Sequence, residues 1–178
     1  MEFKQVVSRR RSTRKFLPTP VEREKLQRIV DAALVAPTSR NTRSTRFFIV
    51  EDRATLERMS QMRDYGSAFM KDATAAIVVT SDRTLTDLWV DNCAIAATTI
   101  QLAIVDEGLA SCWVHVEGRP RLKDNPEGEQ AIDYLRTFID IPEHWAVECA
   151  IALGYSDYQP KPLPEHDDSS SVIWHTKQ

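Results

Sequence analysis

Apolar and polar positions follow two different periods along the chain. Apolar residues spaced three or four apart, the period of a helix, predict helices over residues 2–10, 20–36, 52–59, 86–107 and 127–139. Short, nearly continuous apolar runs predict strands over residues 46–50, 75–80, 109–116 and 145–155. Because interleaved helices and short strands can place helices on both faces of a small sheet, the expected fold class is α+β, a three-layer α/β/α sandwich, in one domain over residues 1–178.

The helix expected over residues 20–36 has the best-defined ends. Thr19 is expected to cap its first turn, with Pro20 at the first helical position and Glu22 completing a capping box. Pro37 should end the helix, because the residue before a proline is disfavoured in helical geometry.

The helix expected over residues 86–107 is apolar on nearly all sides of its second half, which predicts burial on most faces, and Gly108 fits a C-terminal cap. The longest apolar region, residues 93–105, is too short and too interrupted to cross a bilayer, which needs about 20 apolar residues. No secretory signal is expected at the start of the chain. These features predict a cytoplasmic protein with no membrane partner.

The C-terminal tail, residues 156–178, differs from the rest of the chain. Three prolines stand within residues 160–164 and force an extended backbone that excludes a helix. Ile173 and Trp174 near its end gain little by standing in water, so the tail is expected to pack along another surface.

The composition is that of a globular protein, with 42% apolar and 28% charged residues among 178. With 23 Lys and Arg against 26 Asp and Glu, the chain is acidic, which argues against nucleic acid as a partner. Cys93, Cys112 and Cys149 lie far apart in apolar contexts and are expected to be buried free thiols. The four histidines lack the spacing of metal ligands, so no metal site is expected.

Residues 8–16 nevertheless gather five cations, namely Arg9, Arg10, Arg11, Arg14 and Lys15. Two interpretations are open at this point: a local anion site, and a solvated, charged helix end. The planar donor fork of arginine matches the oxygens of a phosphate, and Ser12 adds a hydroxyl donor. The chain has neither G-x-G-x-x-G nor G-x-x-x-x-G-K, so side chains would have to hold any phosphate. On a helix Arg10 and Arg11 point about 100° apart, so a ligand that meets both must be larger than a phosphate.

Five segments in a fixed order resemble the nitroreductase family of flavoproteins: RRSTRKF, APTSRN, FFIV, GLASCW and IALGY. Together with the apolar helix and the tail that carries prolines and a lysine, they extend the resemblance over essentially the whole chain. The resemblance implies a nitroreductase-like fold, with a small mixed or antiparallel sheet flanked by helices. It also implies a homodimer in which the C-terminal tail is exchanged and packs on the partner subunit.

The resemblance further implies an FMN site, whose residues carry over one by one. Its first element comprises Arg10, Arg11, Ser12 and Arg14, and the loop that reaches the same FMN from the partner subunit comprises Pro37, Thr38, Ser39 and Asn41. Trp113, Val114 and His115 match the segment whose backbone lies along the isoalloxazine ring, and Lys161 matches a basic residue on the phosphate. Where the family usually continues with Gln-Pro-Trp, this chain has Arg43, Ser44 and Thr45, and Arg43 is expected to add a cation near the flavin.

Several of these assignments leave an alternative open. His115 can be an ordinary structural histidine, and Lys161 a solvated lysine. Tyr65 and Gly66 lie where the family has a mobile segment on the substrate side, so the glycine would permit a sharp turn and the ring would cover the flavin face. No side chain is expected to act as a catalytic acid, base or nucleophile, because the flavin carries the chemistry.

The implied activity is a ping-pong cycle, in which NADH or NADPH reduces FMN and a nitroaromatic, quinone or similar acceptor then enters the same cleft. Three alternatives stay open: a related flavin enzyme that dehalogenates or modifies flavin, a flavin-binding or redox-sensing protein with little turnover, and a basic interaction module without cofactor. The residues choose neither the acceptor nor one of the two nicotinamides.

Overall fold

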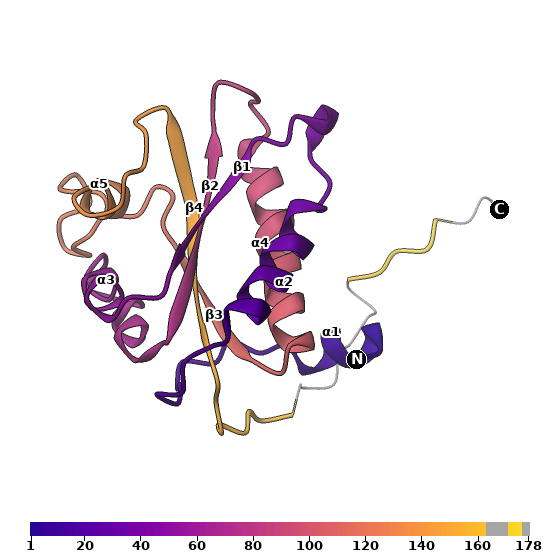
Figure 1. Cartoon of the computed structure of the whole chain (residues 1–178). Helices are drawn as coiled ribbons and strands as arrows, with labels where there is room; N and C mark the ends of the chain where they lie inside the picture. The colour runs from indigo at the N-terminus through magenta and orange to yellow at the C-terminus, as the bar shows by residue number, and fades with distance from the viewer. Residues whose placement is uncertain (163–170, 176–178) are drawn as a thin grey trace.

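The computed structural model describes residues 1–162 and 171–175 (Figure 1). Its helices are Phe3–Arg9 (α1), Arg23–Leu34 (α2), Arg53–Met59 (α3), Trp89–Asp106 (α4) and Ala131–Arg136 (α5), with short 3-10 turns at Ser39–Asn41 (η1) and Ala68–Asp72 (η2). Its strands are Thr45–Val50 (β1), Ala75–Asp82 (β2), Ala110–His115 (β3) and Trp145–Gly154 (β4). Each expected helix and strand is present, although α5 is shorter than predicted because a bridge between Pro120 and Gln130 holds the preceding residues in a loop.

The four strands form one sheet in the order β1-β2-β4-β3, and every neighbouring pair is antiparallel. The two central strands are buried along nearly their whole length. β4 contains a bulge: Val79 pairs with Cys149 while Thr80 pairs with Val147, so Glu148 is an extra residue without a partner on β2. The bulge re-aims the side chains of this part of the strand.

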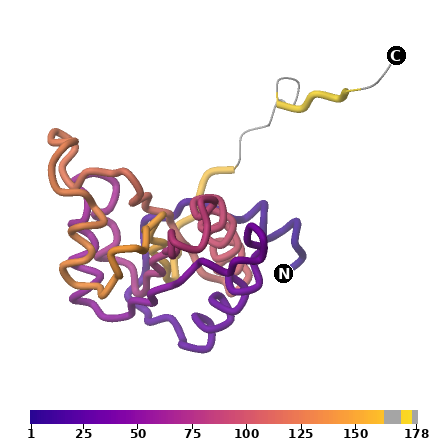
Figure 2. Tube along the Cα trace, turned by 90° about the horizontal axis from the view of Figure 1, so that it is seen from above, coloured from indigo at the N-terminus to yellow at the C-terminus, as the bar shows by residue number. Residues whose placement is uncertain are grey.

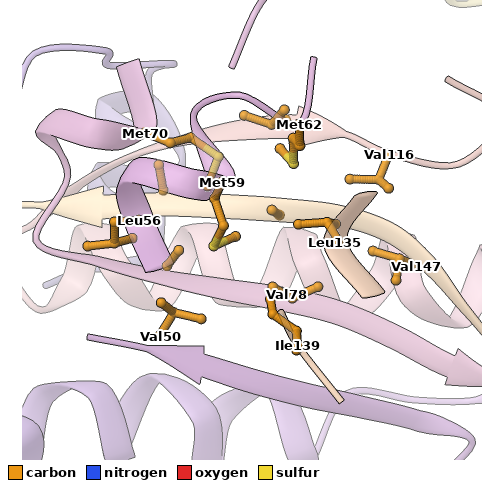
Figure 3. Packing of buried hydrophobic residues seen from close by; sticks show 14 of the residues in the cluster. Val50, Leu56, Met59, Met62, Met70, Val78, Val116, Leu135, Ile139 and Val147 are labelled. Atoms are coloured by element: carbon orange, nitrogen blue, oxygen red, sulfur yellow. The ribbon is translucent and has the colours of Figure 1, made fainter. Parts of the chain in front are cut away.

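Two hydrophobic cores lie on the two faces of the sheet (Figure 1). α2 and α4 cover one face, where Ile104 shares a core with Ile77 of β2. α3 and α5 cover the other face, where Met59 and Leu135 share a core with Val78 (Figure 3). Successive residues of β2 therefore serve different cores, as the alternation of a strand requires. This arrangement confirms the three-layer α/β/α sandwich.

α2 begins later than the sequence predicts. Its first residue is Arg23 and its N-cap is Glu22, which makes no side-chain cap bond, so the expected capping box of Thr19, Pro20 and Glu22 is wrong. The Glu22 carboxylate instead accepts a hydrogen bond of 2.7 Å from the Tyr155 hydroxyl, just after β4. A contact to a distant strand thus takes the carboxylate that the local capping box would need.

α4 is capped as predicted, since Gly108 has a φ of 75° and its N–H donates to the Val105 carbonyl at 3.0 Å. The sequence predicts burial on most faces of this helix, but seven of its 18 residues are buried, along one side. An apolar stripe on its outer side is left uncovered: Ile95 is 41% exposed, and Leu102 and Val105 are only half-buried. Within the described residues, no helix has the length and apolar character that crossing a membrane requires.

The tail leaves the body of the molecule after β4 (Figure 2). Residues 156–162 form neither helix nor strand, as the prolines predict. Residues 171–175 lie away from the sheet and the helices, with Ile173 88% and Trp174 85% exposed. The remaining parts of the predicted exchanged tail, residues 163–170 and 176–178, lie outside the described residues.

Candidate functional site

The arginine segment, residues 10–14, is the first candidate part of a ligand site. α1 ends at Arg9, and a parallel bridge then joins Ser12 to Ser111 at the start of β3. The Thr13 N–H donates to the Ser111 carbonyl at 2.9 Å, which holds the segment against the edge of the sheet. Because side chains alternate along an extended backbone, even-numbered and odd-numbered residues of the segment face opposite sides.

The even-numbered residues Arg10, Ser12 and Arg14 lie on one side of the segment, close enough to Cys112 of β3 for both charges and the hydroxyl to act on its thiol. Burial raises the pKa of the Cys112 thiol, while the charge of Arg14, the Ser12 hydroxyl and the charge of Arg10 act in the opposite direction. Neither guanidinium forms an ion pair with a carboxylate in the described part of the chain. Arg14 lies over the Phe69 ring, with 5.7 Å between the guanidinium carbon and the ring centre. Two cations and a hydroxyl donor therefore stand together on one side of the sheet edge.

Arg11 turns to the other side of the segment. Its guanidinium donates to the carbonyls of Ser8 at 2.6 Å and of Arg10 at 2.8 Å. It lines a cavity of about 220 Å³ together with Tyr158 at the start of the tail. Lys161, a little further along the tail, is exposed. Within one chain, Arg11 and the start of the tail thus lie on one side of the arginine segment. Arg10 and Arg14 lie on the other side.

The β3 residues of the predicted site differ in what they offer. The Val114 side chain is 2% exposed in the core beneath α3 and α5, so only its backbone is available to a ligand. Trp113 packs half-buried toward α2 and α4. His115 is partly exposed at the end of the strand, and its Nδ1 lies 3.6 Å from Oε1 of the buried Glu148. Burial lowers the pKa of His115 and raises the pKa of Glu148.

Tyr65 and Gly66 lie near the same end of β3. The Arg63 guanidinium stacks on the Tyr65 ring at 4.0 Å and donates to the His115 carbonyl at 2.8 Å. Gly66 has a φ of 80°, a conformation that favours glycine, so the sharp turn expected here is present. Arg63 thus links Tyr65 of the predicted substrate-side pair to the backbone of His115.

The second candidate part is the loop of residues 37–43, which is held by a buried side chain of α4. Asn92 is 1% exposed; its Oδ1 accepts the Ser39 N–H at 2.8 Å, and its amide group donates to the Ser44 hydroxyl at 3.2 Å. The Ser81 hydroxyl of β2 bonds that of Ser44 at 2.9 Å. A buried polar network therefore fixes the base of the loop.

The tip of this loop is strained. Arg40, Asn41 and Arg43 have positive φ values of 49°, 53° and 46°, which residues other than glycine adopt only with support from their surroundings. The Arg43 N–H donates to the Thr38 hydroxyl at 3.0 Å and closes the loop on itself. Pro37, Asn41 and Arg43 are exposed, so this fixed shape faces outward.

The two candidate parts lie at opposite ends of α4. The loop contacts Asn92 in the first turn of the helix, whereas the amino group of Met1, next to α1, binds Asp106 at its last residue (Figure 1). At 1.5 Å per residue, the helix between Asn92 and Asp106 is about 21 Å long. One chain therefore does not bring the arginine segment and the loop together.

Three residues with contacts at the site were missed in the sequence, namely Arg63, Asn92 and Glu148. Glu148 is the only charged residue within WAVECAIALG, and Asn92 lies in the first turn of a long apolar helix. A polar residue in an apolar stretch was therefore the signal that could have pointed to these two residues. The three cysteines are buried and free, as predicted. In residues 1–162 and 171–175, no group of three or more metal-ligating side chains comes together.

Known proteins resemble this chain over most of its length. The family model described as "Nitroreductase family" matches residues 7–62 and 60–155. Two archaeal proteins are each named "Putative NADH dehydrogenase/NAD(P)H nitroreductase". The one from Methanothermobacter thermautotrophicus is 34% identical over 90% of this chain and 80% of its own length, and the one from Archaeoglobus fulgidus is 32% identical over 94% and 92%. The solved structure of an FMN-dependent nitroreductase from Clostridium difficile R20291 has a TM-score of 0.89 and 36% identity, covering 96% of this chain and 98% of that one.

Proposed function

The chain is a member of the nitroreductase family, and on that premise we propose that it is an FMN-dependent oxidoreductase. It takes electrons from NADH or NADPH and reduces a nitroaromatic, quinone or similar acceptor in a ping-pong cycle. The observation that carries the proposal is the group of Arg10, Ser12 and Arg14 at the edge of β3, where two cations stand without a carboxylate partner in the described chain. The similarity to an FMN-dependent nitroreductase supports the same cofactor here.

The residues at this edge fit FMN by their chemistry. A phosphate monoester carries close to two negative charges and several acceptor oxygens, and two guanidinium groups with a hydroxyl match it. The chain lacks the glycine-rich loop that a pyrophosphate favours, which supports a mononucleotide over FAD. The backbone from Trp113 to His115 would then lie along the ring system.

FMN, when bound, accepts hydride and passes electrons on. The chain supplies binding and orientation: Arg10 and Arg14 hold the anionic end, and the backbone of β3 supports the ring. Arg63 and Tyr65 border the substrate side at the end of β3, where their stacking shapes the entrance. No side chain is assigned the role of acid, base or nucleophile.

We also propose that the working unit is a homodimer with two shared sites. Three observations support it: the two candidate parts lie at opposite ends of α4, the outer side of α4 keeps an apolar stripe, and Ile173 and Trp174 stand exposed in the tail. In a twofold dimer the loop of one chain can meet the arginine segment of the other. Free, buried cysteines further support a location in the reducing cytoplasm.

The experiment that tests the function is anaerobic reduction of the purified protein. The chromophore is first released by heat and identified by mass, and FMN is the expected result. NADH and NADPH are then added separately and the loss of flavin absorbance is followed, before a panel of nitroaromatic and quinone acceptors is supplied. FAD, or no flavin after reconstitution, contradicts the cofactor assignment. A flavin that neither nicotinamide reduces would instead identify a flavin-binding protein with little turnover.

A further inference from the structure

A buried carboxyl group stands behind the end of β3, outside the residues assigned to the flavin. Glu148 is 4% exposed and sits on the β4 bulge, where its carbonyl accepts the N–H groups of Val116 at 3.0 Å and Glu117 at 3.3 Å. These bonds hold its backbone, so the side chain has a defined direction. Its Oε1 faces Nδ1 of His115 at 3.6 Å, and its Oε2 is buried without a hydrogen-bond partner among the described residues. A carboxyl group in such a place is costly and needs an explanation.

The surroundings of the carboxyl group favour its protonated form. Burial, and then the negative charge of Glu117, raise the pKa of Glu148. The neighbouring groups are thiols, Cys93 of α4 and the adjacent Cys149 on β4 itself, whose own pKa values are raised chiefly by burial, that of Cys93 to about 12. These thiols stay neutral and bring no positive charge to Glu148. Among the described residues, His115 is the basic group that lies within ion-pair distance of this carboxyl group.

The surroundings of the His115 imidazole favour its neutral form. Burial, then the charge of Arg119 and that of Arg63, lower the pKa of His115. A positive charge on the ring is therefore disfavoured, as is a bare negative charge on Glu148. The pair as a whole is therefore most stable when it is net neutral.

We propose that Glu148 is a positioning residue for His115: with Oε1 at 3.6 Å from Nδ1, slightly beyond hydrogen-bond length, it closes on the ring and holds one proton between the two atoms, so that Nε2 presents an N–H donor at the substrate side of the candidate site. The inference rests on the proposed function, because the ligand that meets this donor is the one bound along β3.

The outward donor does not depend on where the bridging proton lies. If the proton is on Glu148, neutral His115 accepts it at Nδ1 and carries its own hydrogen on Nε2. If the proton is on Nδ1, the ring is an imidazolium and Nε2 again carries hydrogen. At higher pH the pair loses this bridging proton. The hydrogen that remains on the ring then sits on Nδ1 and points at the carboxylate, so Nε2 becomes an acceptor. The pair therefore presents a donor below its titration and an acceptor above it.

A donor in this place suits an acceptor molecule with an oxygen that becomes negative as it is reduced, such as a nitro or quinone oxygen. Arg63 donates to the His115 carbonyl and so holds the backbone at the same end of β3. The pair adds a hydrogen bond at the point where charge develops, and it needs no proton transfer to do so.

Histidine-selective NMR of the full chain, as purified and after loading with FMN, tests the inference over about pH 5 to 9. His144 is an internal reference, because it forms a similar histidine–carboxylate pair at the surface. Its Nε2 lies 3.8 Å from Oδ2 of Asp82, and its side chain is 55% exposed. The variants are Glu148→Gln, whose amide can still donate to Nδ1, and Glu148→Leu, which cannot. Asp82→Asn is the matched control at the exposed pair.

In the native chain, the Nε2–H form of His115 is expected to persist through neutral pH. Glu148→Gln should keep this form, while Glu148→Leu should lose the single tautomer and shift the titration of His115 by about one pH unit or more. The signals of His144, which is not in contact with Glu148, should be the same in the native chain and in both Glu148 variants. Titration curves for His115 that superimpose in the native chain and in Glu148→Leu would overturn the inference.

Thermal unfolding gives a second readout with a defined sign. A carboxyl group whose pKa is raised by folding contributes stability that is full below its unfolded pKa and is lost as pH rises through its folded pKa. Glu148→Gln removes this loss, so its melting temperature should rise relative to the native chain as pH increases. A difference that does not change with pH contradicts the buried, titrating carboxyl group.

The proposed flavin site and the Glu148–His115 pair are tested separately by these experiments. If FMN does not bind, the proposed function fails, while the NMR and unfolding experiments still report on the pair. If FMN binds and nicotinamide reduces it, but His115 is insensitive to Glu148→Leu, the function stands and only the inference fails.

Discussion

The arginine segment and the loop of residues 37–43 are candidate parts of one flavin site, yet they are built in opposite ways. The segment lies flat against β3 through backbone bonds, and its Arg10 and Arg14 side chains have no carboxylate partner in the described chain. The loop is strained at three positions and depends on the buried amide of Asn92. Long cationic side chains adjust to a ligand by themselves, whereas a strained backbone keeps its shape only if the interior holds it. The segment thus supplies charge and the loop supplies shape.

The largest expected effect comes from separating the two parts. Ile173→Ser/Trp174→Ser should prevent dimerisation, because these exposed residues are proposed to bury their apolar area on the partner. FMN affinity should then fall by about a hundredfold or more, since every contact from the partner loop is lost. Light scattering after size exclusion and flavin fluorescence measure the two effects. His175→Ser is the control in the same exposed stretch, and a fully dimeric double variant would break the two-chain arrangement.

Removing the support of the loop should have the next largest effect. Asn92→Ala leaves the Ser39 N–H and the Ser44 hydroxyl without their buried partner, which costs about 2–4 kcal/mol of unfolding free energy. Asn125→Ala, at an exposed position, is the control. Urea unfolding measures both. If the two variants are equally stable, the loop does not depend on its buried network.

The charges of the segment should matter for FMN affinity but not for stability. Arg10→Ala and Arg14→Ala should each weaken binding by about tenfold or more, since a hydrogen bond to a charged group contributes about 1.5–3 kcal/mol. Arg9→Ala should have little effect, and Arg11→Ala should behave like it, because the Arg11 side chain faces the opposite side. Titration of the apoprotein with FMN decides the order. Four equal affinities would favour a solvated, charged surface.

The smallest effect concerns backbone strain. Arg40→Gly should raise the unfolding free energy by a few tenths to about 1 kcal/mol, because glycine adopts a positive φ without the cost that arginine has. The same substitution in the extended segment, Arg10→Gly, should lower it, since Arg10 has a φ of −56° and gains nothing from glycine. Urea unfolding measures both changes. Equal changes in unfolding free energy for Arg40→Gly and Arg10→Gly would mean that the loop stores no strain.

Most of the fold followed from the sequence, because the hydrophobic period is a local property that each element carries by itself. The continuous apolar runs of β2 and β4, the long helix α4 and its Gly108 cap were all predicted, and the order of the elements indicated a layered sandwich. The five family segments identified the family and the residues of the candidate flavin site, although none of them states which residues meet in space.

What the tertiary structure decided depends on partners that are distant in the chain. Tyr155 takes the Glu22 carboxylate and delays the start of α2, and the bridge from Ser12 to Ser111 turns a presumed helix end into an extended segment, which separates Arg11 from Arg10. Glu148 meets His115 only because β3 pairs with β4 and a bulge re-aims one residue. Local propensity differs between competing conformations by about 1 kcal/mol or less per residue, so a single long-range hydrogen bond or strand pairing is enough to override it.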